Sequence, residues 1–541
     1  MRVLTASDRA LLVETASLDE AMRLHAALAE VAGVVERVPA ARSVLVHYDP
    51  RRTSPTQLAA AITALNPDAA LPAPTAEVTI PVRYDGEDLE EVAALLGIPR
   101  DEVIRRHLAA TWRVAFAGFA PGFGYLIGDD PLFDVPRRAT PRTRVPTGAV
   151  GLAGEFTGVY PRESPGGWQL IGTTDAAMWD IHRDPPALLE PGAVVRFVRA
   201  EAASAASASP GKAIGRAKAE NAGSSPSAAG SPSPDRTAAP ETTSAATATI
   251  EVTRPALQLL VQDRGRPGHA QLGVSASGIA DRTAMRDGNR AVGNAPDAAV
   301  LECVGAVSLG FTGNGVAAVT GASGGAVIVD IDGSERPVPM GAPFATFDGD
   351  ELHLEAPARG LRYVIAARGG IRTDRVLGSR ATDTLAGLGP APLTLGAIVE
   401  IGSEAPHLVE PDPAPRALPA SGDLVHLDIT LGPRDDWFTP AAVAALTEQE
   451  WLVTPRSDRV GIRLNGETPL ERSQNRELPS EGAVTGAIQV PADGHPVLFL
   501  PDHPLTGGYP IIGALTDASL DLAAQLPPGT RIRFRTQPSS Y

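Results

Sequence analysis

Lysine is almost absent from this chain. Only Lys212 and Lys218 occur among its 541 residues, and both lie in a stretch dominated by Ala, Ser, Pro and Gly. A Walker A phosphate loop, a Ser–Lys amidase site, a Schiff base and a biotin attachment site each depend on a lysine. The sequence therefore excludes these mechanisms from the regions expected to fold.

Cysteine and long apolar runs are also scarce. Cys303 is the single cysteine, so an intrachain disulfide is impossible, and a buried structural thiol is expected rather than a nucleophile. The chain has no basic N-terminal segment followed by an apolar one, and no apolar run long enough to cross a bilayer. We therefore expect a cytoplasmic protein that does not insert into a membrane.

Positive charge is outnumbered by negative charge. The 63 acidic residues and 47 basic residues give a formal net charge of −16, and both kinds are mixed along the chain. Nucleic-acid binding requires a basic face, so it is not expected. The length exceeds what one hydrophobic core supports, and roughly three to four domains are expected.

A small α+β domain is predicted for residues 1–75. A helical apolar pattern begins at Leu18 and ends before Gly33, a suitable residue for a helix C-terminus. Residues 34–48 predict a β-hairpin, and residues 55–65 predict a second helix.

The rest of the chain is predicted to be mainly β, with one linker. Residues 76–200 begin with an alternating strand and two helices and continue as a region rich in Gly and Pro. Residues 201–249 have almost no large apolar side chain and cannot bury enough surface to fold, so a disordered linker is expected. Residues 250–415 and 416–541 contain short strands with Gly and Pro turns, which favours barrels or sandwiches.

One Gly-rich pattern occurs in both halves of the chain. Gly166-Gly167-Trp168 precedes an apolar strand, and so does Gly507-Gly508-Tyr509; the segment 145–150 is likewise echoed by 479–484. Two similar tight β-turns would explain the pattern, and so would a polar pocket built twice. Spacing alone favours the turns.

Three polar residues attract attention by type and position. Arg137 and Arg142 each follow a proline, and a fixed guanidinium suits a carboxylate or a phosphate, although solvation at the surface explains both residues equally well. Asp281 stands where it would cap the helix carrying Asn289, and that cap alone would explain it structurally.

These motifs resemble two families whose members are usually separate chains. Residues 1–199 resemble allophanate hydrolase subunit 1, the type of the B subunit of bacterial 5-oxoprolinase, and residues 250–537 resemble subunit 2, the type of the C subunit. The first resemblance rests on 118–126, Pro136-Arg137, Pro141-Arg142, 157–160, 164–168 and the helix histidine His107. The second rests on 262–266, 278–281, Asn289, 293–294, 301–302, 368–370, 457–459 and 507–510. The linker then marks a fusion of two subunits.

The resemblance implies a fold. It is mainly β with an α+β N-terminal domain, followed by cyclophilin-like β-barrels: one B-type barrel in 76–200, and two C-type barrels in 250–415 and 416–541.

The resemblance also implies three alternative roles. The first is the B–C component of an ATP-dependent 5-oxoprolinase, which would convert pyroglutamate to glutamate with a separate A subunit of the LamB/YcsF type and with ATP and magnesium. The second is the carboxyltransferase component of a urea or amide carboxylase, with biotin supplied by a partner. The third is a regulator that binds a histidine kinase. Contacts between the two halves and a homo-oligomer are also expected.

Both enzymatic roles require an unreactive amide or urea to be polarised and its oxygen charge to be held. Fixed arginines and backbone N–H groups in Gly-rich turns suit this task, with acids or histidines as proton carriers. For catalysis we expect His107, Arg142, Asp281, Glu302 and Asp502. For substrate binding we expect Pro121, Gly122, Tyr125, Arg137, Ser164, Gly166, Gly167, Trp168, Asn289, Arg459, Glu481, Gly507, Gly508 and Tyr509. No metal site is predicted. Allophanate hydrolysis itself is excluded, because its Ser–Ser–Lys site needs a lysine.

Overall fold

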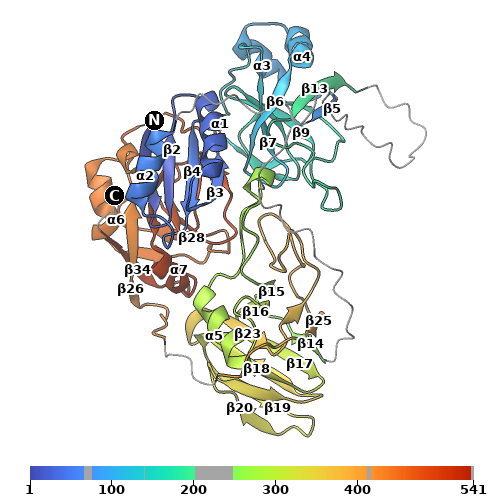
Figure 1. The fold of residues 1–541 in the computed structure, drawn as a ribbon, viewed down its shortest axis with the longest axis vertical. Helices are drawn as coiled ribbons and strands as arrows, with labels where there is room; N and C mark the ends of the chain where they lie inside the picture. The colour runs from blue at the N-terminus through green and yellow to red at the C-terminus, as the bar shows by residue number, and fades with distance from the viewer. Residues whose placement is uncertain (66–75, 139, 201–247, 411–415, 475, 538–541) are drawn as a thin grey trace, which may run out of the picture.

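The computed structural model describes residues 1–65, 76–138, 140–200, 248–410, 416–474 and 476–537. Of the expected linker 201–249, only residues 248 and 249 are described, and they begin strand β14. The fold is mainly β (Figure 1), as predicted. In the described part of the chain, no helix is long and apolar enough to span a membrane.

The N-terminal domain is an antiparallel sheet of order β1-β2-β4-β3 with two helices on one face. Its elements are β1 (Arg2–Ser7), β2 (Ala10–Glu14), α1 (Leu18–Ala27), β3 (Val34–Pro39), β4 (Ser43–Tyr48) and α2 (Pro55–Ala64). The predicted hairpin is confirmed. Because side chains alternate along a strand, Val44 and Val46 pack under the helices while Leu45 points to the opposite face.

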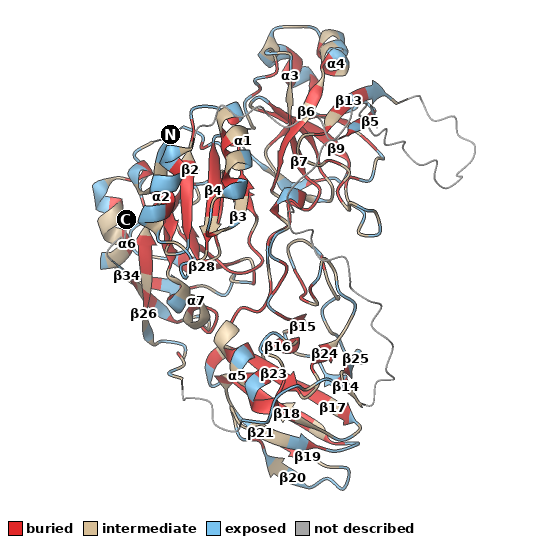
Figure 2. Ribbon diagram, viewed as in Figure 1, coloured by how far each residue is buried: buried red, intermediate tan, exposed pale blue. Residues whose placement is uncertain are grey.

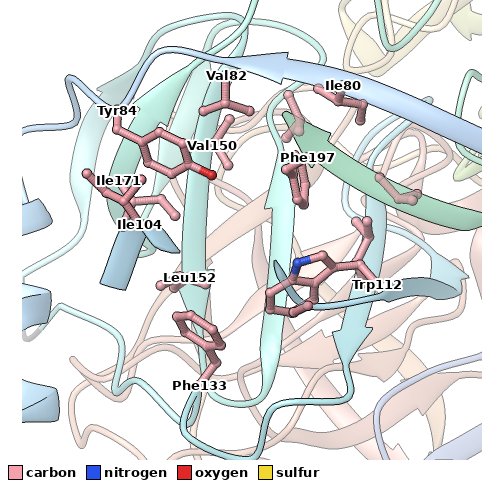
Figure 3. Packing of buried hydrophobic residues seen from close by; sticks show 14 of the residues in the cluster. Ile80, Val82, Tyr84, Ile104, Trp112, Phe133, Val150, Leu152, Ile171 and Phe197 are labelled. Carbon is pink, nitrogen blue, oxygen red and sulfur yellow. The ribbon is translucent and has the colours of Figure 1, made fainter. Parts of the chain in front are cut away.

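The first barrel is a seven-stranded sheet of order β12-β9-β10-β7-β6-β13-β5, and its edge strands meet at a bridge between Arg83 and Thr173. Its elements are β5 (Glu77–Val82), α3 (Leu89–Leu96), α4 (Arg100–Ala109), β6 (Trp112–Ala117), β7 (Gly124–Gly128), β9 (Ala149–Ala153), β10 (Phe156–Val159), β12 (Gln169–Thr173) and β13 (Val194–Arg199). A separate ladder joins β8 (Arg142–Val145) to β11 (Ser164–Gly166). Trp112, Phe133 and Phe197 lie in its core (Figure 3).

The middle unit contains two sheets that share one core. Their orders are β20-β19-β22-β17-β14-β25-β24 and β15-β16-β23-β18-β21, and helix α5 (Arg282–Val292) packs on β18 and β23. The strands are β14 (Ala248–Arg254), β15 (Gln258–Gln262), β16 (Val300–Val304), β17 (Val307–Thr312), β18 (Gly315–Ser323), β19 (Ala326–Val329), β20 (Glu335–Pro337), β21 (Pro343–Thr346), β22 (Glu351–Leu354), β23 (Arg359–Ala367), β24 (Ile371–Arg372) and β25 (Ile398–Ile401).

The last unit is a closed barrel of order β26-β33-β30-β31-β28-β27-β34. Its elements are β26 (Leu424–Leu431), α6 (Pro440–Glu448), β27 (Trp451–Val453), β28 (Gly461–Asn465), β30 (Ala487–Gln489), β31 (Val497–Phe499), β33 (Ile511–Leu515), α7 (Asp517–Ala523) and β34 (Arg531–Thr536). A short ladder, β29 (Glu481–Gly482) with β32 (Thr506–Gly507), stands beside it.

The first and last barrels repeat one topology. In each, the first and last strands pair in parallel, β5 with β13 and β26 with β34. Gly148 and Gly486 occupy equivalent turns: both have positive φ, and their N–H groups donate to Tyr160 O at 2.8 Å and to Phe499 O at 2.9 Å. The predicted match of 145–150 with 479–484 is therefore wrong in register, because it pairs Gly148 with Gly482.

The two ends of the chain pack together. The N-terminal domain, blue in Figure 1, lies against the orange and red last barrel, and β1 contacts β26 and β33. Figure 2 shows that β2 and β4 are buried. Leu12 and Leu45 share a core with Val484 and Phe499. Gly482 permits this approach, because an added Cβ would lie 2.7 Å from the Cβ of Leu45.

Candidate functional site

The Gly-rich loop between β6 and β7 carries the predicted residues Pro121 and Gly122, and it meets the second half of the chain. Gly122 N donates to Leu272 O at 2.9 Å, and Phe119 N donates to Thr506 Oγ1 at 3.1 Å. Phe119 has φ 63°, a conformation that costs free energy for a residue with a Cβ. The loop therefore fits against the β32 region at the expense of local strain.

Gly508 faces the first barrel at the same contact. Arg137 donates to Ser480 Oγ at 3.3 Å. A Cβ added at Gly508 would lie 3.0 Å from Nη1 of Arg137. Arg137 also pairs with Glu477 at 2.8 Å. It lines a pocket of about 740 Å³ between the N-terminal domain, the first barrel and the last barrel. Tyr509 is 42% exposed.

Arg142 lies on the β8–β11 ladder, opposite Gly166. Its Nη2 donates to Asp88 Oδ1 at 2.7 Å, and Arg138 binds the same oxygen at 2.6 Å. Hydrogen bonding to the buried Asp88 carboxylate raises the pKa of Arg142. Nη1 of Arg142 is buried without a hydrogen-bond partner among the described residues, as is Oγ of Ser164 on the partner strand.

An aromatic cluster backs this ladder. Trp168 packs edge-on against Phe123 at 5.2 Å between ring centroids, and Tyr125 stacks on Phe116 at 4.4 Å. A Cβ added at Gly166 would collide with the hydroxyl of Tyr160, whereas Gly167 stands beside Pro141. Burial raises the pKa of Tyr160. The charges of Arg137 and Arg142 oppose this rise, so both guanidinium groups act on the Tyr160 hydroxyl.

A buried ionic network joins the middle unit to the last barrel. Arg459 forms ion pairs with Glu302 and with Asp502, the latter at 3.0 Å, and all three side chains are at most 1% exposed. Glu302 accepts from Ala280 N at 2.9 Å, and Asp502 accepts from Ser277 Oγ at 2.6 Å. These predicted residues therefore lie together, and each of them is paired with other protein groups.

Two other predicted residues belong to helix α5. Asp281 caps it by accepting from Ala284 N at 2.9 Å, and it also binds Arg416 and Gln525. Asn289 is fully buried and donates to Ala298 O at 2.8 Å. The structure places neither residue beside Arg142.

Glu481 is buried and paired with Arg434, which also binds Glu14 of the N-terminal domain at 3.0 Å. Through these two ion pairs Arg434 joins the last barrel to the N-terminal domain. Arg434 N donates to Ile511 O on β33, just as Asp88 N donates to Leu170 O on β12. The ion pairs Asp88–Arg142 and Arg434–Glu481 therefore occupy equivalent places in the two barrels. The acidic and the basic residue have exchanged positions between them.

His107 lies inside the first barrel and is fully buried. Its Nδ1 meets Tyr84 Oη at 2.8 Å, its Nε2 meets Thr157 Oγ1 at 3.2 Å, and its ring packs on Phe197 at 4.5 Å. Burial lowers the pKa of His107 to about 3, so the ring is neutral at physiological pH.

Asp383 and two arginines that face it were not predicted from the sequence. Asp383 is 1% exposed, and its Oδ2 has no hydrogen-bond partner among the described residues. Burial, followed by the charge of Asp502, raises the pKa of Asp383 to about 6. Arg162 of the first barrel and Arg266 both act electrostatically on this carboxylate, and each also has one buried unpartnered nitrogen. The polar run 378–383 was the available signal.

In the part of the chain that the structure describes, no three His, Cys, Asp or Glu side chains come together to hold a metal ion. The arrangement instead offers arginine and backbone N–H donors at the contact between the halves, chemistry suited to an oxyanion.

The sequence matches the family described as carboxyltransferase domain, subdomain C and D, over residues 1–189, and carboxyltransferase domain, subdomain A and B, over residues 272–536. It is 41% identical over 194 residues to the B subunit of 5-oxoprolinase from Escherichia coli O157:H7, covering 34% of this chain and 87% of that one. It is 32% identical over 289 residues to the C subunit of 5-oxoprolinase from Escherichia coli K12, covering 53% and 90%.

The crystal structure of TTHA0988 aligns with a TM-score of 0.77 and 33% identity, covering 97% of this chain and 99% of that one. Urea amidolyase of Lachancea kluyveri is 31% identical over 321 residues, which cover 54% of this chain but only 17% of that protein. The fold and the matched segments thus define a protein of the carboxyltransferase-domain type. The chain belongs to the family of the B and C subunits of 5-oxoprolinase, with both types fused in one polypeptide.

Proposed function

We propose that this chain is the B–C component of an ATP-dependent 5-oxoprolinase that converts pyroglutamate to glutamate together with a separate A-type subunit. The observation that carries the proposal is that a B-type half and a C-type half occur in one polypeptide and meet at the predicted Gly-rich motifs. Two subunits that act on one substrate gain from being joined, because their effective concentration rises.

The chemical task is to break the lactam C–N bond while water adds to the carbonyl carbon. The lactam oxygen gains negative charge in the transition state, and fixed donors stabilise such charge strongly. We assign this role to Arg142, supported by Arg137 and by backbone N–H groups near Gly166, Gly167 and Gly508. ATP with magnesium would supply the free energy, and the A-type partner the remaining groups.

His107, Asp281 and the network of Glu302, Arg459 and Asp502 take structural roles in this proposal. They are buried, and each has protein hydrogen-bond partners. A group that transfers a proton to substrate must come within hydrogen-bond reach of it. Asp383, with one unsatisfied oxygen, is a better candidate for proton transfer than these residues.

The test is an assay of glutamate release from pyroglutamate with the purified chain and an A-type subunit. The proposal expects release only when both proteins and ATP are present. Omitting either protein, or ATP, is the control. Equal release from the A-type subunit alone would contradict it.

Carboxyl transfer is the second candidate, favoured by the match to urea amidolyase. Biotin would arrive on a partner, because the described regions contain no lysine to carry it. Consumption of carboxybiotin that depends on urea, with no glutamate release in the first assay, would replace the first proposal by this one.

A further inference from the structure

A second pocket lies in the middle unit, apart from the contact between the halves. Its volume is about 410 Å³, within the range of small-molecule sites. Four arginines line it: Arg264, Arg372, Arg375 and Arg380. The lining acids are Asp263, Asp297 and Glu404, so basic groups are in excess.

The buried Asp263 carboxylate has both of its oxygens occupied by hydrogen-bond donors of the surrounding loops. Oδ1 accepts from Gly265 N at 2.8 Å and from Ser379 Oγ at 2.6 Å, and Oδ2 accepts from Arg380 N at 2.7 Å. These bonds join two of the loops that form the pocket wall.

A buried pair of amides joins two further walls. Asn289 donates to Ala298 O at 2.8 Å, Asn294 donates to Asn289 Oδ1 at 3.1 Å, and Asn294 Oδ1 accepts from Gly369 N at 2.8 Å. Buried amides cost free energy unless they are hydrogen-bonded. The hydrogen bonds of these two amides hold the loops at Ala298 and Gly369 in one arrangement before any ligand binds.

Gly369 brings main chain directly against main chain at the pocket. It has φ 103°, and an added Cβ would collide with the carbonyl oxygen of Gly402. A residue with a side chain cannot occupy this position without moving one wall. The pocket surface near Gly369 and Gly402 is therefore made of backbone, which lets a ligand approach closely.

Backbone carbonyls orient two of the guanidinium groups. Arg375 Nη1 donates to Gly378 O at 3.0 Å, and Arg380 Nε donates to Thr373 O at 3.0 Å. Arg264 is 3.8 Å from Asp297, and both side chains are exposed, so the ion pair between them is weak. Guanidinium groups oriented by backbone carbonyls, as those of Arg375 and Arg380 are, can bind carboxylate or phosphate oxygens through paired N–H groups.

We propose that this pocket binds the phosphate or carboxylate group of a small anionic ligand. The lining arginines provide the charge, and Asp263, Asn289 and Asn294 preorganise the loops. Asn289, predicted from the sequence to touch substrate, instead acts as a positioning residue. The proposal goes beyond the oxoprolinase role and does not depend on it, because the measurement is of binding alone.

The test is titration calorimetry of the full chain with three separate probes: inorganic phosphate, ATP without magnesium, and acetate. Saturable binding of at least one probe is expected, and the probe that binds identifies the source of the oxyanion. Arg375→Gln should weaken that binding about tenfold, the effect of losing one charge-assisted hydrogen bond. Arg375 is exposed, so an unchanged melting temperature is expected.

Arg286→Gln is the matched control, since Arg286 is an exposed arginine of the same unit outside the pocket lining. Its affinity should equal that of the unmodified chain. Arg264→Gln provides a second pocket variant with the same expected loss. No binding of any probe, or equal losses in Arg375→Gln and Arg286→Gln, would overturn the proposal.

Discussion

Trp112 and Trp451 hold the same position in two barrels of this chain. Each indole N–H donates to the backbone carbonyl five residues earlier, that of His107 at 3.0 Å and that of Leu446 at 2.9 Å. A glycine makes room for each ring, Gly128 in the first barrel and Gly466 in the last. The counterpart of His107 is thus a buried leucine. The barrel architecture does not require a histidine at this place.

His107→Leu should therefore preserve the fold and the activity per folded molecule. Tyr84 and Thr157 lose a buried hydrogen-bond partner, which should lower the free energy of unfolding by about 1–3 kcal/mol. Urea denaturation and the glutamate-release assay measure the two effects. Loss of turnover with unchanged stability would instead support a catalytic histidine.

Arg459→Met should destabilise the chain strongly, because it leaves Glu302 and Asp502 buried without their main counter-charge. Removing one partner of a buried ion pair lowers the free energy of unfolding by about 3–5 kcal/mol. Thermal unfolding measures the loss. Adding Glu302→Gln and Asp502→Asn to this variant should recover part of it, whereas no recovery would show that the charges are not the cause.

The sequence predicts individual helices and strands better than it predicts which distant residues they contact. Periodicity locates β4 and its hairpin, and the cap position locates Asp281, because these signals span few residues. The register of the repeat, with Gly486 as the counterpart of Gly148, depends on hydrogen bonds to distant strands. Local spacing carries no information about such bonds.

Asp383 should make stability depend on pH. Burial raises its pKa to about 6, so the folded state binds a proton that the unfolded chain has lost above about pH 4. Its contribution is fully present below pH 4 and is lost as the pH rises through 6. Asp502, Arg266, Arg459 and Arg162 are the charged groups that face it.

Asp383→Asn removes this titration, while its side-chain oxygen can still accept from Leu385 N and Ala386 N. The variant should gain stability relative to the unmodified chain between pH 4 and pH 6. Denaturant unfolding at a series of pH values measures this difference. A difference that stays constant across the range would show that Asp383 does not titrate there.

Arg142→Ala should abolish glutamate release and also lower stability modestly. Its side chain is only 17% exposed and pairs with buried Asp88, so a loss of about 1–2 kcal/mol is expected. Arg138→Gln is the matched control, because Arg138 binds the same carboxylate oxygen without a predicted role at the substrate. Equal losses of turnover in both variants would make Arg142 a structural residue.

The candidate site shows the same limit as the fold. The Gly-rich segments 118–126 and 507–510 were singled out because Gly-rich turns are local features, and Gly118 and Gly508 lie at the contact between the halves. Arg142 was proposed from the sequence, but its partner Asp88, 54 residues away, was not. Partners brought together only by tertiary structure leave no trace in spacing.

The oxoprolinase role of this chain is best examined by measuring ADP and glutamate in one reaction of the chain with an A-type subunit, ATP, magnesium and pyroglutamate. We expect both products to appear together in equal amounts, and neither to form at that rate when this chain is omitted. Glutamate formed without ADP, or formed equally well by the A-type subunit alone, would contradict this role.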